Sequence, residues 1–160
     1  MKKIAFILIA IVAGVFQAEA QERKLLTAGT DVPVVATEGI NAYILKEGQM
    51  IEFATADDVK LESGEIAIPK GSQVSARVRT SLKQRFLANQ KKRIIIDIKD
   101  VKLPNGKKVA LTNGVASFTV SKDTGDLDAV PLKIASSNKY LIPTDYVMHA
   151  KVDVSMDISK

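Results

Sequence analysis

Apolar and polar residues alternate with a period of two along much of this 160-residue chain, and nothing after residue 20 shows the 3.6-residue periodicity of an amphipathic helix. Such alternation is typical of strands with one buried and one solvated face. We therefore expect an all-β protein, a single antiparallel β-barrel or sandwich domain of about nine or ten strands. The pattern is clearest near the C-terminus, where one side of a predicted strand carries Met148, Ala150, Val152, Val154, Met156 and Ile158.

Turn residues divide this pattern into strands. A Pro and a Gly separate residues 66–68 from a strand that starts near Val74, and the Gly is expected to serve the backbone conformation. Two Asn-Gly pairs flank 108–111 and predict three consecutive antiparallel strands over 93–103, 108–111 and 115–120. The structural turns that we single out are Pro69, Gly71, Asn105, Gly106, Asn113 and Gly114.

The segment 68–78 has two partial copies elsewhere in the sequence. Ile-Pro opens both 68–78 and 142–152, with apolar residues six, eight and ten positions after each Ile, and 29–34 is similar to 71–76. Either an internal repeat or convergent use of a turn followed by a strand explains the pattern. In 29–36 the ring of Pro33 confines the predicted strand to a sheet edge or to its own first residues.

The N-terminus has the three parts of a secretory signal peptide. Lys2 and Lys3 precede an apolar run over 4–15, and Ala18-Glu19-Ala20 matches a cleavage site. We expect a signal peptide over 1–20, a flexible lead-in over 21–28 and a single all-β domain over 29–160. The apolar run is shorter than a membrane-spanning helix, and no second run of that length follows. These features predict export to the periplasm, the outside of the cell or the outer membrane.

The absence of Cys and the net charge limit the kinds of chemistry and binding expected of this chain. The sequence contains no Cys, which excludes disulfides, a lipid-modified cysteine and thiol catalysis. Removal of 1–20 leaves 21 basic against 17 acidic residues, so the mature chain carries a charge of +4. This mild excess is compatible with weak attraction to anionic surfaces and is smaller than that of a typical nucleic-acid-binding domain.

Catalytic and metal-binding patterns are poor. The single histidine, His149, lies on the polar side of the last predicted strand, where a solvated residue is the simpler interpretation. Asp123, Asp126 and Asp128 lack the spacing of an EF-hand loop, and Asp57-Asp58 is better explained by a turn than by a catalytic pair. No phosphate-binding or dinucleotide motif is present. We expect no enzyme activity, cofactor or metal.

A basic segment is the strongest candidate binding feature. Seven positive charges fall within seventeen residues with no acid between the first and last. The functional interpretation is a surface for an anionic glycan, a lipid headgroup or nucleic acid. The alternative is a solvated hairpin tip whose charges discourage edge pairing. The candidate anion-binding residues are Arg77, Arg79, Lys83, Arg85, Lys91, Lys92 and Arg93.

Two stretches also carry a family resemblance. The first joins Gly29-Thr30, Asp57-Asp58-Val59 and 68–72, and the second joins Lys83-Gln84-Arg85, Arg93 to Ile96 and the turn over 103–111. Together they resemble the periplasmic β-domain of the VirB10/TrbI proteins of type IV secretion and conjugation, over about residues 29–113. The resemblance implies a non-enzymatic β-domain that assembles with other envelope proteins. The inner-membrane anchor, Pro-rich linker and membrane-crossing insertion of that family have no counterpart here, so a membrane-spanning role is not carried over.

Overall fold

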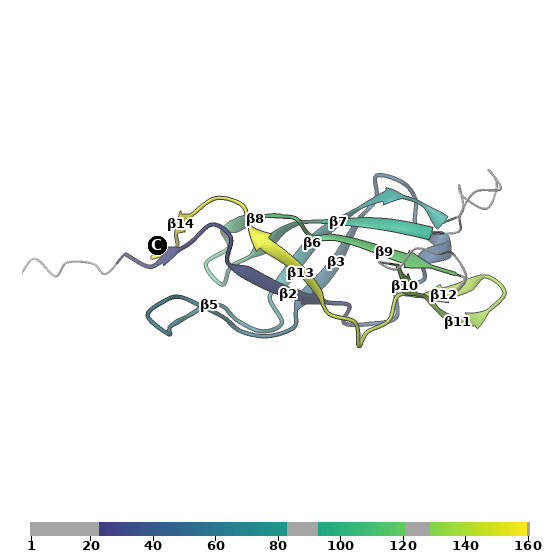
Figure 1. Ribbon diagram of the computed structural model, residues 1–160, viewed down its shortest axis with the longest axis horizontal. Coiled ribbons are helices and arrows are strands. Elements are labelled where there is room, and N and C mark those ends of the chain that lie inside the picture. Colours follow the sequence, from purple (N-terminus) through teal and green to yellow (C-terminus); the bar gives the residue numbers. More distant parts are fainter. Residues whose placement is uncertain (1–22, 83–92, 121–128, 160) are drawn as a thin grey trace, which may run out of the picture.

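The computed structural model describes residues 23–82, 93–120 and 129–159. Within these ranges the chain is almost entirely β, as the alternation predicted, with one short 3-10 turn, η1 (Figure 1). In chain order the elements are β1 (Leu25–Leu26), β2 (Asp31–Val35), η1 (Ala42–Ile44), β3 (Met50–Thr55), β4 (Val59–Lys60), β5 (Ile66–Ile68), β6 (Gln73–Thr80), β7 (Arg93–Lys102), β8 (Lys108–Thr112), β9 (Val115–Thr119), β10 (Val130–Pro131), β11 (Lys133–Ser136), β12 (Lys139–Leu141), β13 (Met148–Val152) and β14 (Met156–Asp157).

Eight strands form the main sheet, in the order β10-β9-β7-β6-β3-β2-β13-β8, and a further pairing of β7 with β8 closes six of them into a ring. Pairing within the ring is antiparallel, but β10 runs parallel to β9, so the sheet is mixed and the expectation of a purely antiparallel domain is wrong. The count of nine or ten strands is also too low for the described residues. Six strands of two to four residues form separate pairs, β1–β14, β4–β5 and β11–β12, and are too short to give a periodic signal.

The buried sides of the ring strands form one core. On β6, Val74, Ala76 and Val78 are fully buried while Arg77 and Arg79 are exposed, as the alternation predicted. A register shift opposite Ser75 and Ala76 moves the buried side of β7 from Ile98 to Val101. A β-bulge of this kind places two residues against one and so switches the alternation. The core therefore remains continuous along the longest strand of the molecule.

The turn between β5 and β6 is held by a buried threonine. Thr55, at the end of β3, is 2% exposed. Its hydroxyl donates to the Pro69 carbonyl oxygen at 2.7 Å and accepts from the Ser72 N–H at 2.9 Å. Gly71 has a φ of +81° and donates its N–H to the Thr55 carbonyl oxygen. The expected role of Gly71 in backbone conformation is confirmed, because this region of φ favours glycine.

The two Asn-Gly pairs differ in structure. Asn105-Gly106 forms the expected hairpin turn between β7 and β8, with Gly106 at a φ of +84°. Asn113-Gly114 does not reverse the chain: β8 and β9 both run antiparallel to β7 and follow one another along it. The prediction of three consecutive antiparallel strands is therefore wrong. A Cβ on Gly114 would lie 2.6 Å from the Ile98 Cβ and 2.7 Å from the Ala150 Cβ, so close packing accounts for this glycine.

Three further expectations are corrected near the chain ends. The last strand stops at Val152, and Val154 is 67% exposed, because the chain leaves the ring to pair β14 with β1. Order begins before residues 28–30, since β1 already buries Leu26 within the expected flexible lead-in. Strand β2 lies between β3 and β13 and not at an edge; Pro33 is accommodated because pairing with β3 is confined to Val34 and Val35.

In the part of the chain that the structure describes, no helix has the length and apolar composition that crossing a membrane requires.

Candidate interaction surfaces

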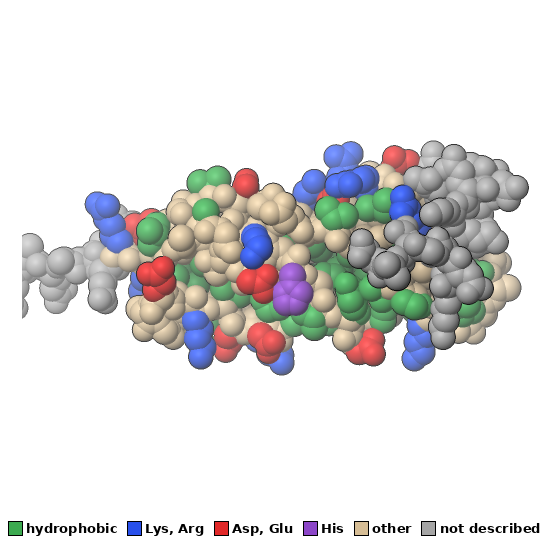
Figure 2. Space-filling view, viewed as in Figure 1, with side chains coloured by type: hydrophobic (Ala, Val, Ile, Leu, Met, Phe, Trp, Pro, Cys, Tyr) green, Lys and Arg blue, Asp and Glu red, His purple; other side chains and the backbone are tan. Residues whose placement is uncertain are grey.

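The structure describes three of the seven predicted anion-binding residues. Arg77 and Arg79 lie on the exposed side of β6, and Arg93 is the first residue of β7. The other four, Lys83, Arg85, Lys91 and Lys92, lie outside the described residues. In Figure 2, Lys and Arg side chains gather near the residues drawn in grey, on the side where β6 ends and β7 begins.

The neighbouring strand supplies an acid that lies outside the basic segment in sequence. Asp97 of β7 lies opposite Arg77 in the register, and its side chain is only 14% exposed. Arg79 holds this carboxylate with both ends of its guanidinium, Nε to Oδ2 at 3.0 Å and a terminal nitrogen to Oδ1 at 2.6 Å. The Lys99 Nζ lies 3.8 Å from the same carboxylate. Arg79 is thus largely neutralised, while no carboxylate of the described residues lies within ion-pair distance of Arg77.

The residues considered for catalysis and metal binding have structural partners. His149 is exposed on β13, as expected, and its Nδ1 lies 2.8 Å from the Asp31 carboxylate of β2. Asp57 and Asp58 lie in the turn before β4, where Asp58 accepts the Lys70 N–H at 2.7 Å. Asp123, Asp126 and Asp128 lie outside the described residues. Within residues 23–82, 93–120 and 129–159, no three His, Cys, Asp or Glu side chains lie close enough to hold a metal ion.

A second candidate surface was missed in the sequence. It is formed by Tyr43 and Ile44 of η1 with Ile134 and Tyr140 of the β11–β12 hairpin, and we name these four residues the tyrosine cluster. The two rings are 6.1 Å apart between centroids and tilted by 42°, and Ile134 lies directly opposite Tyr140. Ile44 is 67% exposed and Ile134 is 61% exposed. The hairpin lies at the end of the elongated molecule opposite β1 and β14 (Figure 1).

Asn41 holds the two halves of the tyrosine cluster together. Its side-chain oxygen accepts from the N–H groups of Tyr43 at 3.2 Å and Tyr140 at 3.1 Å. Its side-chain nitrogen donates to the Asn138 carbonyl oxygen at 3.2 Å, and its backbone forms a β-bridge with Leu141. These bonds cap η1 and attach it to β12. The backbone that carries the two tyrosines of the cluster is therefore held in place without a partner.

A groove opens at the base of the same hairpin. Its volume is about 730 Å³, and its lining is mainly Pro131, Leu132, Leu141, Ile142 and Pro143, with Lys133 and Asp145 among its polar residues. Gly39 leaves room beside it, because a Cβ there would lie 3.2 Å from Leu141 Cδ1. The groove and the tyrosine cluster share the hairpin as a common wall.

The sequence contained only a weak signal for this end of the molecule. The segments over 40–45 and 130–138 have no clear period, and so neither predicts an element with a defined face. The chain has three Tyr and no Trp, and two of the three Tyr belong to or adjoin these segments. Aromatic residues in aperiodic segments are the one sign that could have indicated a surface there.

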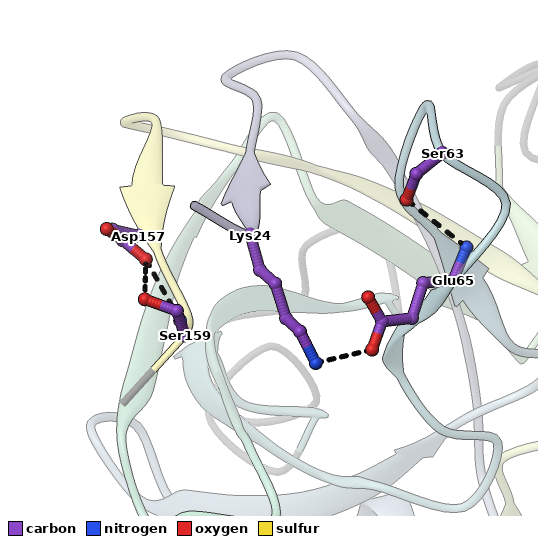
Figure 3. A network of polar contacts seen from close by, with 5 residues as sticks. All are labelled: Lys24, Ser63, Glu65, Asp157 and Ser159. Carbon is purple, nitrogen blue, oxygen red and sulfur yellow. Dashed lines mark hydrogen bonds and ion pairs between the residues drawn. The ribbon is translucent and has the colours of Figure 1, made fainter. Parts of the chain in front are cut away.

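Polar contacts also secure the opposite end of the molecule, where the first and last of the described strands, β1 and β14, pair (Figure 3). Lys24 forms an ion pair with Glu65, which joins the segment before β1 to the β4–β5 hairpin. The hydroxyl and the N–H of Ser159 both donate to Asp157 Oδ1. These hydrogen bonds stabilise the carboxylate and lower the pKa of Asp157 below its ordinary value.

No protein-family model and no curated protein sequence matches this chain.

Proposed function

We propose that this protein is an exported, non-catalytic β-domain that acts as an interaction and assembly module in the bacterial cell envelope. The closed ring of strands around one core supports a small β-barrel over a sandwich. The N-terminal signal pattern supports export, and the VirB10/TrbI-like order of turns and strands supports a role in assembly. Other envelope proteins are the partners that this proposal requires.

The tyrosine cluster is the observation that carries the proposal. Single exposed apolar side chains are ordinary on protein surfaces, but here exposed Ile134 lies opposite Tyr140, the Tyr140 ring lies beside that of Tyr43, and exposed Ile44 follows Tyr43 in η1. Asn41 holds the backbone at both tyrosines. Tyrosine is enriched among residues that dominate binding energy at interfaces. A fixed cluster loses little conformational entropy when a partner binds.

In-cell crosslinking tests this function. A photoreactive amino acid in place of Ile44 should give a discrete crosslinked product with an envelope protein. The same amino acid in place of Val154 is the matched control, because Val154 is equally exposed and lies near the chain ends. Identical products at both positions, or none at Ile44, would contradict an interaction surface at this end.

Binding of an anionic glycan, lipid headgroup or nucleic acid through residues 77–93 is the second candidate. It is favoured by the exposed side of β6, where Arg77 has no ion-pair partner among the described residues and Arg93 and Lys99 follow on the next strand. The charge is partly offset, because Asp97 neutralises Arg79. Arg77 is then the described cation best placed for an anion, because Lys99 also lies within ion-pair distance of Asp97.

Charge variants separate this candidate from a solvated face. Arg77→Gln should lower the salt concentration that elutes the protein from an anionic matrix, and Asp97→Asn should raise it by releasing Arg79. Lys151→Gln, on β13 across the ring, is the control for net charge. Neutralising Lys91, Lys92 and Arg93 together should abolish retention at low salt. If Arg77→Gln and Lys151→Gln lowered the eluting salt concentration equally, retention would depend on the net charge of the protein and not on a site on β6.

A further inference from the structure

We propose that the outer edge of β11 binds an acidic, extended segment of a partner protein, which adds a strand beside the β11–β12 hairpin. This inference rests on the proposed function and specifies the chemistry of its partner. Four features of the hairpin support it: its unpaired edge, its adjoining anchor residues, its charge and its groove.

The edge of β11 is available for pairing. All four residues of β11 are exposed, and β12 is the only strand of the described residues that pairs with it. A strand with one neighbour presents a row of N–H and C=O groups to solvent. An extended peptide can satisfy these groups in recognition by strand addition, where main-chain hydrogen bonds supply affinity.

The tyrosine cluster provides adjoining apolar anchors. Ile134 lies on β11 itself and faces Tyr140 across the hairpin, and Tyr140 contacts the Tyr43 ring. Apolar side chains of an added strand would lie beside Ile134, since cross-strand neighbours on one face lie about 4.5–5.5 Å apart between Cβ atoms. Asn41 holds the backbone beside this anchor, because its side-chain oxygen accepts from the N–H groups of both tyrosines.

The charge of the hairpin selects the sign of the partner. From Lys133 to Leu141 the hairpin contains two cations, Lys133 and Lys139, and no Asp or Glu, while Asp145 lines the groove at its base. Both lysines are exposed, and each occupies an end of a hairpin strand. An added strand with acidic residues would gain favourable pairs with them, whereas a basic strand would be repelled.

The groove favours a polypeptide partner with side chains of its own. It borders β11 at Lys133 and is lined mainly by apolar residues. Its volume of about 730 Å³ exceeds what one aliphatic side chain fills. In strand-addition complexes, pockets next to the edge receive alternate side chains and supply specificity.

Fluorescence anisotropy with synthetic peptides tests the inference. The probe is a fluorescein-labelled eight-residue peptide of alternating Glu and Val, and we expect saturable binding to the mature protein. Ile134→Asp should weaken binding at least tenfold, because it removes an apolar anchor and repels the acidic peptide. Ala135→Pro should also weaken it at least tenfold, because it removes a backbone N–H and stiffens the edge of β11. Lys133→Glu combined with Lys139→Glu should weaken it similarly. Val154→Asp is the matched control and should leave binding unchanged.

Circular dichroism checks that each variant is folded. The milder Ile134→Ser variant provides a second test of the anchor, because a side chain that is 61% exposed is not needed in the core. A peptide of alternating Lys and Val, and a Glu-Val peptide with a central Pro, should both bind at least tenfold more weakly. Equal binding of all three peptides, or binding that survives Ile134→Asp, would overturn strand addition. Strand addition by an acidic partner would also be overturned if the protein formed dimers that Ile134→Asp disrupts and that the acidic peptide leaves intact.

The two proposals fail separately. A crosslink at Ile44 without peptide binding would retain the interaction module and exclude the strand-adding acidic segment. Absence of both would reject the module at this end of the molecule.

Discussion

At the scale of single residues, Thr55 links two parts of the chain that the sequence shows as unrelated. Thr55 is the last residue of β3, and its hydroxyl also donates to the Pro69 carbonyl oxygen and accepts the Ser72 N–H in the turn before β6, where the Ser72 hydroxyl donates to the same carbonyl. A buried hydroxyl with a donor and an acceptor partner is stabilising because neither backbone group needs water. The turn at Pro69 to Ser72 therefore depends on a residue from a different strand.

Replacing this hydroxyl tests the dependence. Thr55→Val keeps the shape and leaves the Ser72 N–H and the Pro69 carbonyl without this partner, so we expect a loss of about 1–3 kcal/mol in the free energy of unfolding. Urea denaturation measures it. Thr37→Val, at an exposed position, should change stability by less than about 0.5 kcal/mol. Similar midpoints for the two variants would contradict the role of Thr55.

At the scale of elements, the connection from β8 to β9 shows how a glycine can serve packing. The two strands follow one another along β7, and Gly114 lets the backbone approach β7 and β13 at the point where β8 turns aside to close the ring. Its carbonyl oxygen accepts the Ile98 N–H at 2.7 Å. A side chain at this position would force the strands apart.

Gly114→Ala should therefore be more destabilising than an alanine at a glycine with a positive φ. We expect a loss of about 3 kcal/mol from steric overlap with Ile98 and Ala150. Gly64→Ala, where φ is +86° and no atom lies within 4 Å of the added Cβ, should cost about 1–2 kcal/mol. Thermal unfolding of both variants decides the comparison, and a reversed order would show that the β8–β9 connection accommodates a side chain at Gly114.

At the scale of the whole molecule, different features lie at the two ends of its long axis. At one end, β1 pairs with β14 and Lys24 forms an ion pair with Glu65. The other end carries the tyrosine cluster, the groove and the exposed hairpin.

The pairing of β1 with β14 depends on one buried leucine of β1. Leu26 is 1% exposed and Leu25 is 53% exposed, although they are consecutive residues of β1. Leu26→Ala should lower the free energy of unfolding by about 2–4 kcal/mol through the cavity it leaves. Hydrogen exchange in β14 should accelerate in the same variant, because β1 is the one described strand that pairs with β14. Leu25→Ala is the adjacent control, and an equal effect of both would show that β1 is not part of the core.

Much of the strand content was predictable from sequence, and so was the exposure of Arg77 and Arg79 on β6. The burial of β6 and of β13, the hairpin at Asn105-Gly106 and the conformation of Gly71 agree with local pattern. The errors concern the partners of strands. Pro33 in an inner strand, the continuation through Asn113-Gly114 and the early start at β1 all depend on which segment lies alongside.

The sequence by itself determined that this chain forms strands and which side of the long ones is buried, because the two-residue period of a pleated strand is a local property. Only the tertiary structure decided that six strands close into a ring, that Asp97 neutralises Arg79, and that Tyr43 and Tyr140 meet. Strand pairing rests on backbone hydrogen bonds, which nearly every residue can make, so the sequence carries little information about partners. The contacts that define both candidate surfaces are of this long-range kind.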